Sequence, residues 1–150
     1  MTKQSRWLHT TTIPALLILV LAFAWTGIGA AQNTRPTADD APAIIAVKFH
    51  ADWCGYCKAM GPVFEELQAK YDQQPVLFVT FDQTREFNRQ QSRYLAQAMG
   101  LNDAWTQYGG KTGFILLIDA GSKKVVERLD HEQTLKQIGA ALQNAVADAR

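Results

Sequence analysis

The sequence predicts an α/β domain, a mixed sheet with helices on both faces, and three observations lead to this fold class. Two apolar runs of strand length, 44–49 and 76–81, enclose a segment with helical periodicity. Two further runs, 114–118 and 124–128, are joined by the turn 120–123 and predict a hairpin. Helical segments follow the second run and the hairpin. The predicted order is therefore β-α-β-α-β-β-α, with the first two strands parallel through a right-handed crossover.

Each predicted helix carries its apolar residues on one side, as expected for helices that pack on a sheet. The helices cover residues 54–71, 84–99 and 134–147. The first contains Pro62, which predicts a kink because proline cannot donate the i to i−4 hydrogen bond. The second ends at Gly100, and glycine commonly stops a helix.

The composition suits one globular domain behind a leader. The chain has 150 residues, of which 47% are hydrophobic and 19% charged, and these proportions argue against disorder. The formal net charge is +1, so no large basic field is available and we expect no nucleic-acid partner. The chain has two cysteines, which are too few for a disulfide scaffold.

Residues 1–31 predict a signal peptide or an N-terminal membrane anchor. Lys3 and Arg6 form a basic head, an apolar run follows at 13–25, and small residues close the segment. The small residues favour cleavage. The alternative is an uncleaved anchor, because the span from residue 13 to residue 31 has 19 residues, close to the ~20 that cross a bilayer.

In either case we expect the domain to be exported, to the periplasm or another extracytoplasmic compartment where disulfides form. A membrane is expected as a partner only through the N-terminal anchor. Residues 32–43 are polar and contain two prolines, which predicts a linker. Residues 44–150 are expected to form the domain.

Both cysteines lie at the junction between the first strand and the first helix. Cys54 stands near the first turn of that helix, where unpaired backbone N–H groups and the helix dipole favour an anion. Such positions lower a cysteine pKa from ~8.5 to about 3.5–7.5. Cys57 follows three residues later, near enough to close a disulfide with Cys54 or to resolve a mixed one. The spacing predicts a redox dithiol.

The run 49–58, Phe-His-Ala-Asp-Trp-Cys-Gly-Tyr-Cys-Lys, with Pro62 and the late hairpin 114–128, resembles the thioredoxin superfamily. The likeness covers roughly residues 44–148 and implies a thioredoxin-like fold and a thiol–disulfide oxidoreductase, which is an enzyme without a cofactor. The resemblance implies that Cys54 is the nucleophile and Cys57 the resolving thiol. The implied partners are protein disulfide or dithiol substrates and an upstream electron donor or acceptor.

The resemblance assigns tuning roles to three neighbours of the cysteines. Trp53 is expected to shield the thiols, and Gly55 and Tyr56 to tune the reduction potential. We favour a reductase of exported proteins that maintains redox homeostasis. Because Gly-Tyr is similar to the dipeptide of bacterial disulfide isomerases, an oxidase or isomerase stays open as the alternative.

Two positions depart from the family pattern. Lys48 stands six residues before Cys54, where the family has a buried acid. One hypothesis is that Lys48 lowers the pKa of Cys57 or of the pair, and the other is that its ammonium reaches the sheet edge. Gly113 stands where the family has a cis-proline facing the cysteines. Thr112 and Gly113 are expected to bind substrate, on a glycine-rich loop that we expect to be mobile.

A function of a different class stays open as well. The chain could be a metal-binding or chaperone-like module that kept the fold, with His50, Cys54, Cys57 and His131 as conceivable ligands. Because no second C-x-x-C motif is present, we predict no metal site. Lys58 rather than a histidine follows the second cysteine, which disfavours haem attachment.

Overall fold

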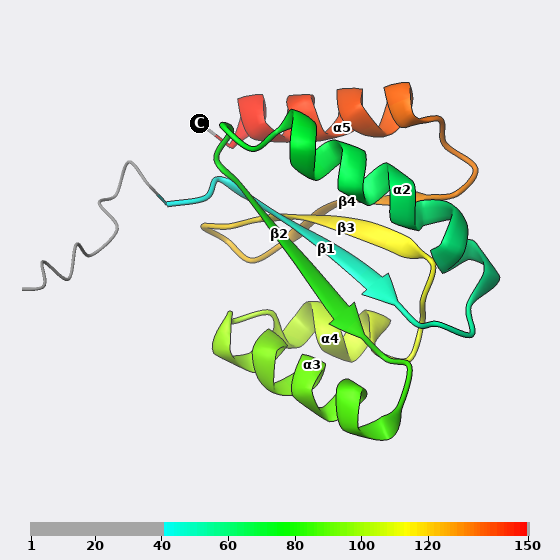
Figure 1. Cartoon of the computed structure of the whole chain (residues 1–150). Helices are drawn as coiled ribbons and strands as arrows, with labels where there is room; N and C mark the ends of the chain where they lie inside the picture. Colours follow the sequence, from blue (N-terminus) through cyan, green and yellow to red (C-terminus); the bar gives the residue numbers. More distant parts are fainter. Residues whose placement is uncertain (1–40, 150) are drawn as a thin grey trace, which may run out of the picture. The chain divides into compact units, whose positions relative to one another are not determined.

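A mixed sheet with helices on both faces makes up the part of the chain that the computed structural model describes, residues 41–149 (Figure 1). The predicted signal peptide or anchor, and most of the predicted linker, lie outside these residues. The elements follow in the order β1 (Ile44–His50), α2 (Gly55–Lys70), β2 (Val76–Asp82), α3 (Glu86–Ala98), α4 (Asn102–Tyr108), β3 (Phe114–Asp119), β4 (Val125–Asp130) and α5 (Leu135–Asp148). The predicted fold class is confirmed, and the ends of the predicted elements differ by no more than one or two residues.

The topology of the sheet brings three chain segments to one edge. The strand order is β2-β1-β3-β4, with β1 parallel to β2 and antiparallel to β3. Phe49 near the end of β1 is opposite Phe81 near the end of β2 and Phe114 at the start of β3. The segments after β1 and β2 and the segment before β3 therefore meet at the same edge. The predicted parallel pairing of the first two strands is confirmed.

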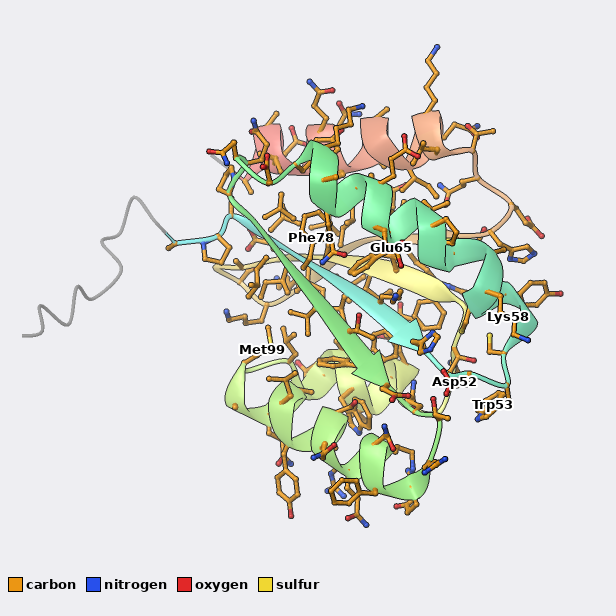
Figure 2. All side chains as sticks on the ribbon, in the orientation of Figure 1. Asp52, Trp53, Lys58, Glu65, Phe78 and Met99 are labelled. Carbon is orange, nitrogen blue, oxygen red and sulfur yellow. The ribbon has the colours of Figure 1, made fainter. Side chains whose placement is uncertain are left out.

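The sheet separates two apolar clusters, because alternate residues of a strand point to opposite faces. Ile44 and Ala46 belong to the cluster beneath α2 and α5, whereas Val47 and Phe49 belong to the cluster beside α3 and α4. Side chains fill the space between the sheet and both helical layers in Figure 2. In the second cluster Phe49 stacks on Phe114 with ring centroids 4.9 Å apart. Burying apolar surface contributes about 25 cal/mol per Å², so these clusters dominate the stability.

Helix α4 is absent from the sequence-based prediction, which assigned no helix between residue 99 and the third strand. This helix has only seven residues, and its N-cap residue Leu101 makes no capping hydrogen bond through its side chain. Such a segment has little helix propensity of its own. Tertiary packing holds it in place, since Ala104 is buried and the Trp105 ring stacks on Phe49 with ring centroids 6.5 Å apart.

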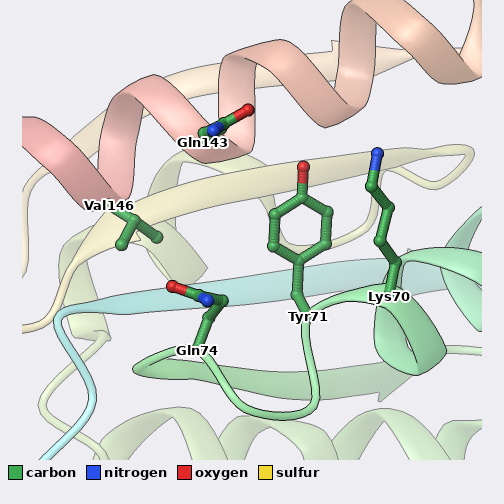
Figure 3. Close-up of a pocket in the computed structure, with 5 residues that line it drawn as sticks. All are labelled: Lys70, Tyr71, Gln74, Gln143 and Val146. Carbon is green, nitrogen blue, oxygen red and sulfur yellow. The ribbon is translucent and has the colours of Figure 1, made fainter.

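The C-terminal end of α2 packs against α5 through one buried hydrogen bond. The Tyr71 hydroxyl donates to the Gly139 carbonyl at 2.8 Å, beside a small pocket lined by Lys70, Gln74, Gln143 and Val146 (Figure 3). Helices rise about 1.5 Å per residue, so this pocket lies about 20 Å along α2 from Cys57. It is therefore separate from the cysteines. Within residues 41–149, no helix is long and apolar enough to cross a membrane.

Two phenylalanines test which contacts carry the stability. Phe81 is fully buried and meets Phe49 and Trp105 edge to face, with centroids 5.4 and 5.6 Å apart. We expect Phe81→Ala to lower the free energy of unfolding by about 3–5 kcal/mol, because it leaves a cavity. Phe87 on α3 is 68% exposed, so the matched control Phe87→Ala should change the free energy of unfolding by less than about 0.5 kcal/mol. Urea titration followed by circular dichroism measures both, and equal losses would contradict this account of the core.

Candidate active site

Cys54 is the N-cap residue of α2. Its backbone is extended, with φ −86° and ψ 117°, and its Sγ accepts a hydrogen bond from the backbone N–H of Cys57 at 3.2 Å. A serine or aspartate oxygen normally has this capping role, and a thiolate is an anionic acceptor for the same N–H group. The residue is 7% exposed and belongs to neither of the two large apolar clusters. Cys54 thus lies outside the two main apolar clusters, and only a small part of it is accessible to solvent.

Cys57 lies in the first turn of α2 and is the inner thiol, with 2% exposure. Its Sγ accepts from the Ala51 backbone N–H at 3.4 Å and donates to the Phe49 carbonyl at 3.7 Å. Both cysteines are free thiols. The pair thus consists of an outer sulfur that caps the helix and an inner sulfur held by the end of β1.

The surroundings move the two pKa values in opposite directions. Burial by itself raises the pKa of the Cys54 thiol, but hydrogen bonds from the Cys57 and Thr112 side chains and from the backbone N–H groups of Cys57 and Tyr56 outweigh it and lower that pKa. For Cys57, burial and then the neighbouring Cys54 sulfur raise the pKa, and the Ala51 N–H offsets this only in part. The first proton to leave the pair is therefore that of Cys54.

Gly113 lies directly against the outer sulfur. Its φ is +91°, and a Cβ atom at this position would be 2.8 Å from the Tyr56 Cβ and 3.4 Å from the Cys54 Sγ. Its N–H donates to the Phe49 carbonyl at 2.9 Å. Proline has φ near −65° and no N–H, so it fits neither the backbone angle nor this bond. Glycine at this position is a requirement of the local geometry.

Thr112 precedes Gly113, and its side chain acts to lower the pKa of both cysteine thiols. The sequence indicated Thr112 only for backbone contact with a substrate, which stays a prediction. The effect of its side chain on the pKa of the thiols was missed. A hydroxyl 55 residues after Cys57 becomes visible only once the antiparallel β3 brings the residues before it to the end of β1.

Two exposed aromatic side chains form the rim of the site. Trp53 is 66% exposed, and its indole N–H donates to the Thr84 carbonyl at 3.2 Å. Figure 2 places Trp53 where β1 ends and α2 begins. Tyr56 is 58% exposed and stacks on His131 with ring centroids 3.8 Å apart and an angle of 21° between the planes. Gly55, in the first turn of α2, has open space around its Cα. These residues surround the cysteines, and their tuning roles stay predictions.

Lys48 packs against an aromatic ring of α2. Its Nζ lies 4.8 Å from the centroid of the Phe64 ring, beneath α2, and the side chain is half-buried. The pKa of Cys57 is raised rather than lowered, and Ala51, Cys54 and Thr112 supply the hydrogen bonds and charge that act on it. The hypothesis that Lys48 lowers the pKa of Cys57 or of the pair stays a prediction.

The conceivable metal ligands do not converge. His50 Nε2 pairs with Asp52 Oδ1 at 3.1 Å, whereas the His131 ring lies on Tyr56. Among the residues that the structure describes, no group of three or more histidine, cysteine, aspartate or glutamate side chains is placed to hold a metal ion. The geometry thus gives the metal-binding alternative no ligand set.

Comparison with known proteins defines the class of this domain. The family model Thioredoxin matches residues 32–97, which include β1, the two cysteines, α2, β2 and most of α3. This segment of the chain is therefore part of a thioredoxin-like domain. The match ends before Thr112 and Gly113, so their positions at the site come from the structure alone.

The relatives share only this segment. Protein disulfide-isomerase 1 of Caenorhabditis elegans is 42% identical over 55 residues, which are 36% of this chain and 11% of that protein. Thioredoxin H-type of Picea mariana is 43% identical over 49 residues, covering 33% of this chain and 39% of that protein. A solved mutant thioredoxin from Halobacterium salinarum NRC-1 has 22% identity and a TM-score of 0.45, covering 70% of this chain and 76% of that chain. The matched segments thus span well under half the length of the curated relatives.

The Thr112 hydroxyl gives the first test of the site. We expect Thr112→Val to raise the pKa of Cys54, because the thiolate loses one donor. A hydrogen bond to a charged group contributes ~1.5–3 kcal/mol, so iodoacetamide alkylation at pH 7 should slow on the order of tenfold relative to its high-pH plateau. Thr80→Val, an exposed threonine on β2, is the control and should leave the pH profile unchanged. An unchanged profile for Thr112→Val would remove this hydroxyl from the site.

Proposed function

We propose that this protein is a thiol–disulfide oxidoreductase for proteins of an exported compartment, with reduction of disulfides as its favoured direction. The observation that carries the proposal is the asymmetry of the pair. Cys54 caps a helix and its thiol has a lowered pKa, whereas Cys57 is the inner residue and its thiol has a raised pKa. A low-pKa outer sulfur beside a protonated inner sulfur is the arrangement that two-step thiol–disulfide exchange needs.

The first step is attack by the Cys54 thiolate on one sulfur of a substrate disulfide. A bond forms between Cys54 and that sulfur, the substrate S–S bond breaks, and the second substrate sulfur leaves as a thiolate and takes up a proton. In the resulting mixed disulfide, Cys54 has lost its negative charge. Because that charge and the bond to the Cys54 sulfur contribute to the raised pKa of Cys57, the pKa of Cys57 falls at this stage.

The second step is attack by Cys57 on the Cys54 sulfur. The Ala51 N–H, which already points at Cys57 Sγ, stabilises the thiolate that forms there. The Cys54–Cys57 bond forms, the mixed disulfide breaks, and the substrate leaves with both sulfurs reduced. Two electrons have passed to the substrate. An upstream dithiol must then reduce the new disulfide, and in the opposite direction the same steps oxidise a substrate dithiol.

The resemblance of residues 49–58 to the thioredoxin superfamily and the curated relatives support this class of activity. The favoured direction rests on the resemblance of the hairpin residues Leu117, Ile118 and Asp119 to membrane-tethered reductases. Because of the Gly55-Tyr56 dipeptide, an oxidase or isomerase is the second candidate function. Export rests on residues 1–31, which begin with a basic head and continue with an apolar run.

Serine variants of the two cysteines test the mechanism. We expect that neither Cys54→Ser nor Cys57→Ser accelerates the reduction of insulin by dithiothreitol beyond the uncatalysed rate. Only Cys57→Ser should accumulate a mixed disulfide with the substrate, since its nucleophile remains and its resolving thiol is gone. Non-reducing electrophoresis and mass spectrometry detect the adduct. Trapping by Cys54→Ser instead would reverse the two roles, and full activity of both variants would overturn the proposed function.

The reduction potential decides the direction. Equilibration of the purified protein with glutathione buffers should give a value near ~−270 mV for a reductase and near ~−120 mV for an oxidant. We expect the former. A reduction potential near the oxidising value would contradict the reductase and favour the oxidase or isomerase alternative.

A fusion to the full-length chain tests export. Alkaline phosphatase is active only where disulfides form, so a C-terminal fusion expressed in bacteria should be active. Deleting residues 1–31 should abolish that activity while the fusion still accumulates. N-terminal sequencing of the mature product separates a cleaved signal peptide from a retained anchor, and activity of the truncated fusion would contradict export by this segment.

A further inference from the structure

Gln83 connects the end of β2 to the loop that faces the cysteines. The residue is 6% exposed, and its carboxamide is bonded at both ends: Oε1 accepts from the Gly110 N–H at 2.6 Å and Nε2 donates to the Lys111 carbonyl at 2.8 Å. Its backbone N–H donates to the His50 carbonyl at 2.8 Å. One residue is thus fixed to the end of β1 and to two consecutive positions of the loop.

We propose that Gln83 is a positioning residue for the dithiol, which clamps the loop from Gly110 to Gly113 so that Gly113 lies against the Cys54 sulfur and the Thr112 side chain is held where it acts on the dithiol. Gln83 touches neither cysteine and acts through Thr112. The inference rests on the proposed function in that it treats Cys54 and Cys57 as the reacting groups. No motif in the sequence marks Gln83, because its partners are backbone groups of a distant loop.

The composition of the loop makes such a clamp necessary. Gly110 and Gly113 have φ of +87° and +91°, and neither has a side chain that could anchor the loop by packing. We expected this glycine-rich loop to be mobile, yet the structure bonds it to three separate elements. Lys111 N–H donates to the Tyr108 carbonyl at 3.0 Å and Gly113 N–H to the Phe49 carbonyl at 2.9 Å. The Gln83 carboxamide supplies the remaining attachment, at the two residues directly before Thr112.

The carboxamide matches this site better than related side chains do. The Gly110 N–H needs an acceptor and the Lys111 carbonyl needs a donor, and an amide offers one of each. A glutamate would satisfy only the N–H, and a methionine neither. A buried donor or acceptor left without a partner costs about 1–3 kcal/mol, so the loop without Gln83 would move to regain solvent or other partners. Thr112 would move with it.

The experiment compares Gln83→Met with a matched control in the reduced, full-length protein. Tyr71→Phe serves as the control, because it also removes one buried hydrogen bond, at the distant end of α2. The pH profile of Cys54 alkylation by iodoacetamide separates two effects: the midpoint reports the thiolate, and the plateau reports access. For Gln83→Met we expect the rate at pH 7, relative to the plateau, to fall on the order of tenfold. For Tyr71→Phe we expect no change in this ratio.

A double-mutant cycle tests whether Gln83 acts through Thr112. In a Thr112→Val background, Gln83→Met should slow alkylation at pH 7 no further, because the hydroxyl that it positions is already gone. Gln83→Glu, which keeps the bond to the Gly110 N–H, should give an intermediate effect and serves if the methionine variant fails to fold. An unchanged midpoint in both Gln83 variants, or an equal slowing with and without the Thr112 hydroxyl, would overturn the proposal. Alkylation needs no redox partner, so it tests the role of Gln83 separately from the proposed function. If the expected alkylation changes are observed but the protein does not reduce insulin, only the proposed function is contradicted.

Discussion

The hydrogen bond from the Cys57 N–H to the Cys54 sulfur is the contact on which the rest of the site depends. At 3.2 Å it makes one cysteine the cap of the helix that contains the other. The first N–H groups of any helix lack partners within the helix and attract negative charge. The helix thus orients the outer sulfur and stabilises its anion, and that sulfur together with burial raises the pKa of the inner thiol. A change in the start of α2 would alter all three properties together.

The sheet supplies what a helix terminus cannot supply alone. Parallel β1 and β2 end at one edge, and antiparallel β3 begins there, so three loops from distant parts of the chain meet around the cysteines. The Phe49 carbonyl is the common point, since it accepts from both the Cys57 thiol and the Gly113 N–H. The apolar cluster around the Phe49 ring therefore also holds the backbone atom that aligns the inner thiol with the facing loop.

Two departures from the thioredoxin pattern have different physical meanings. Gly113 is explained by its surroundings, because a positive φ and the close Tyr56 side chain leave room for no other residue. Lys48 packs its ammonium over Phe64 and leaves the inner thiol without a nearby carboxylate from this position. The proton of Cys57 is then governed by the state of Cys54 itself, which links the second step of the proposed exchange to completion of the first.

The sequence by itself determined the order of strands and long helices, because apolar periodicity and the glycines and prolines between segments are local signals. It also indicated Cys54 and Cys57 as the pair for which we propose the redox reaction, since three residues at the start of a helix set their separation. Only the tertiary structure decided the approach of Gly113 to the Cys54 sulfur, the folding of α4 and the bonds of Gln83. Each of these depends on atoms that are far apart in the chain and adjacent only after the sheet has formed, so no local pattern of residues records them.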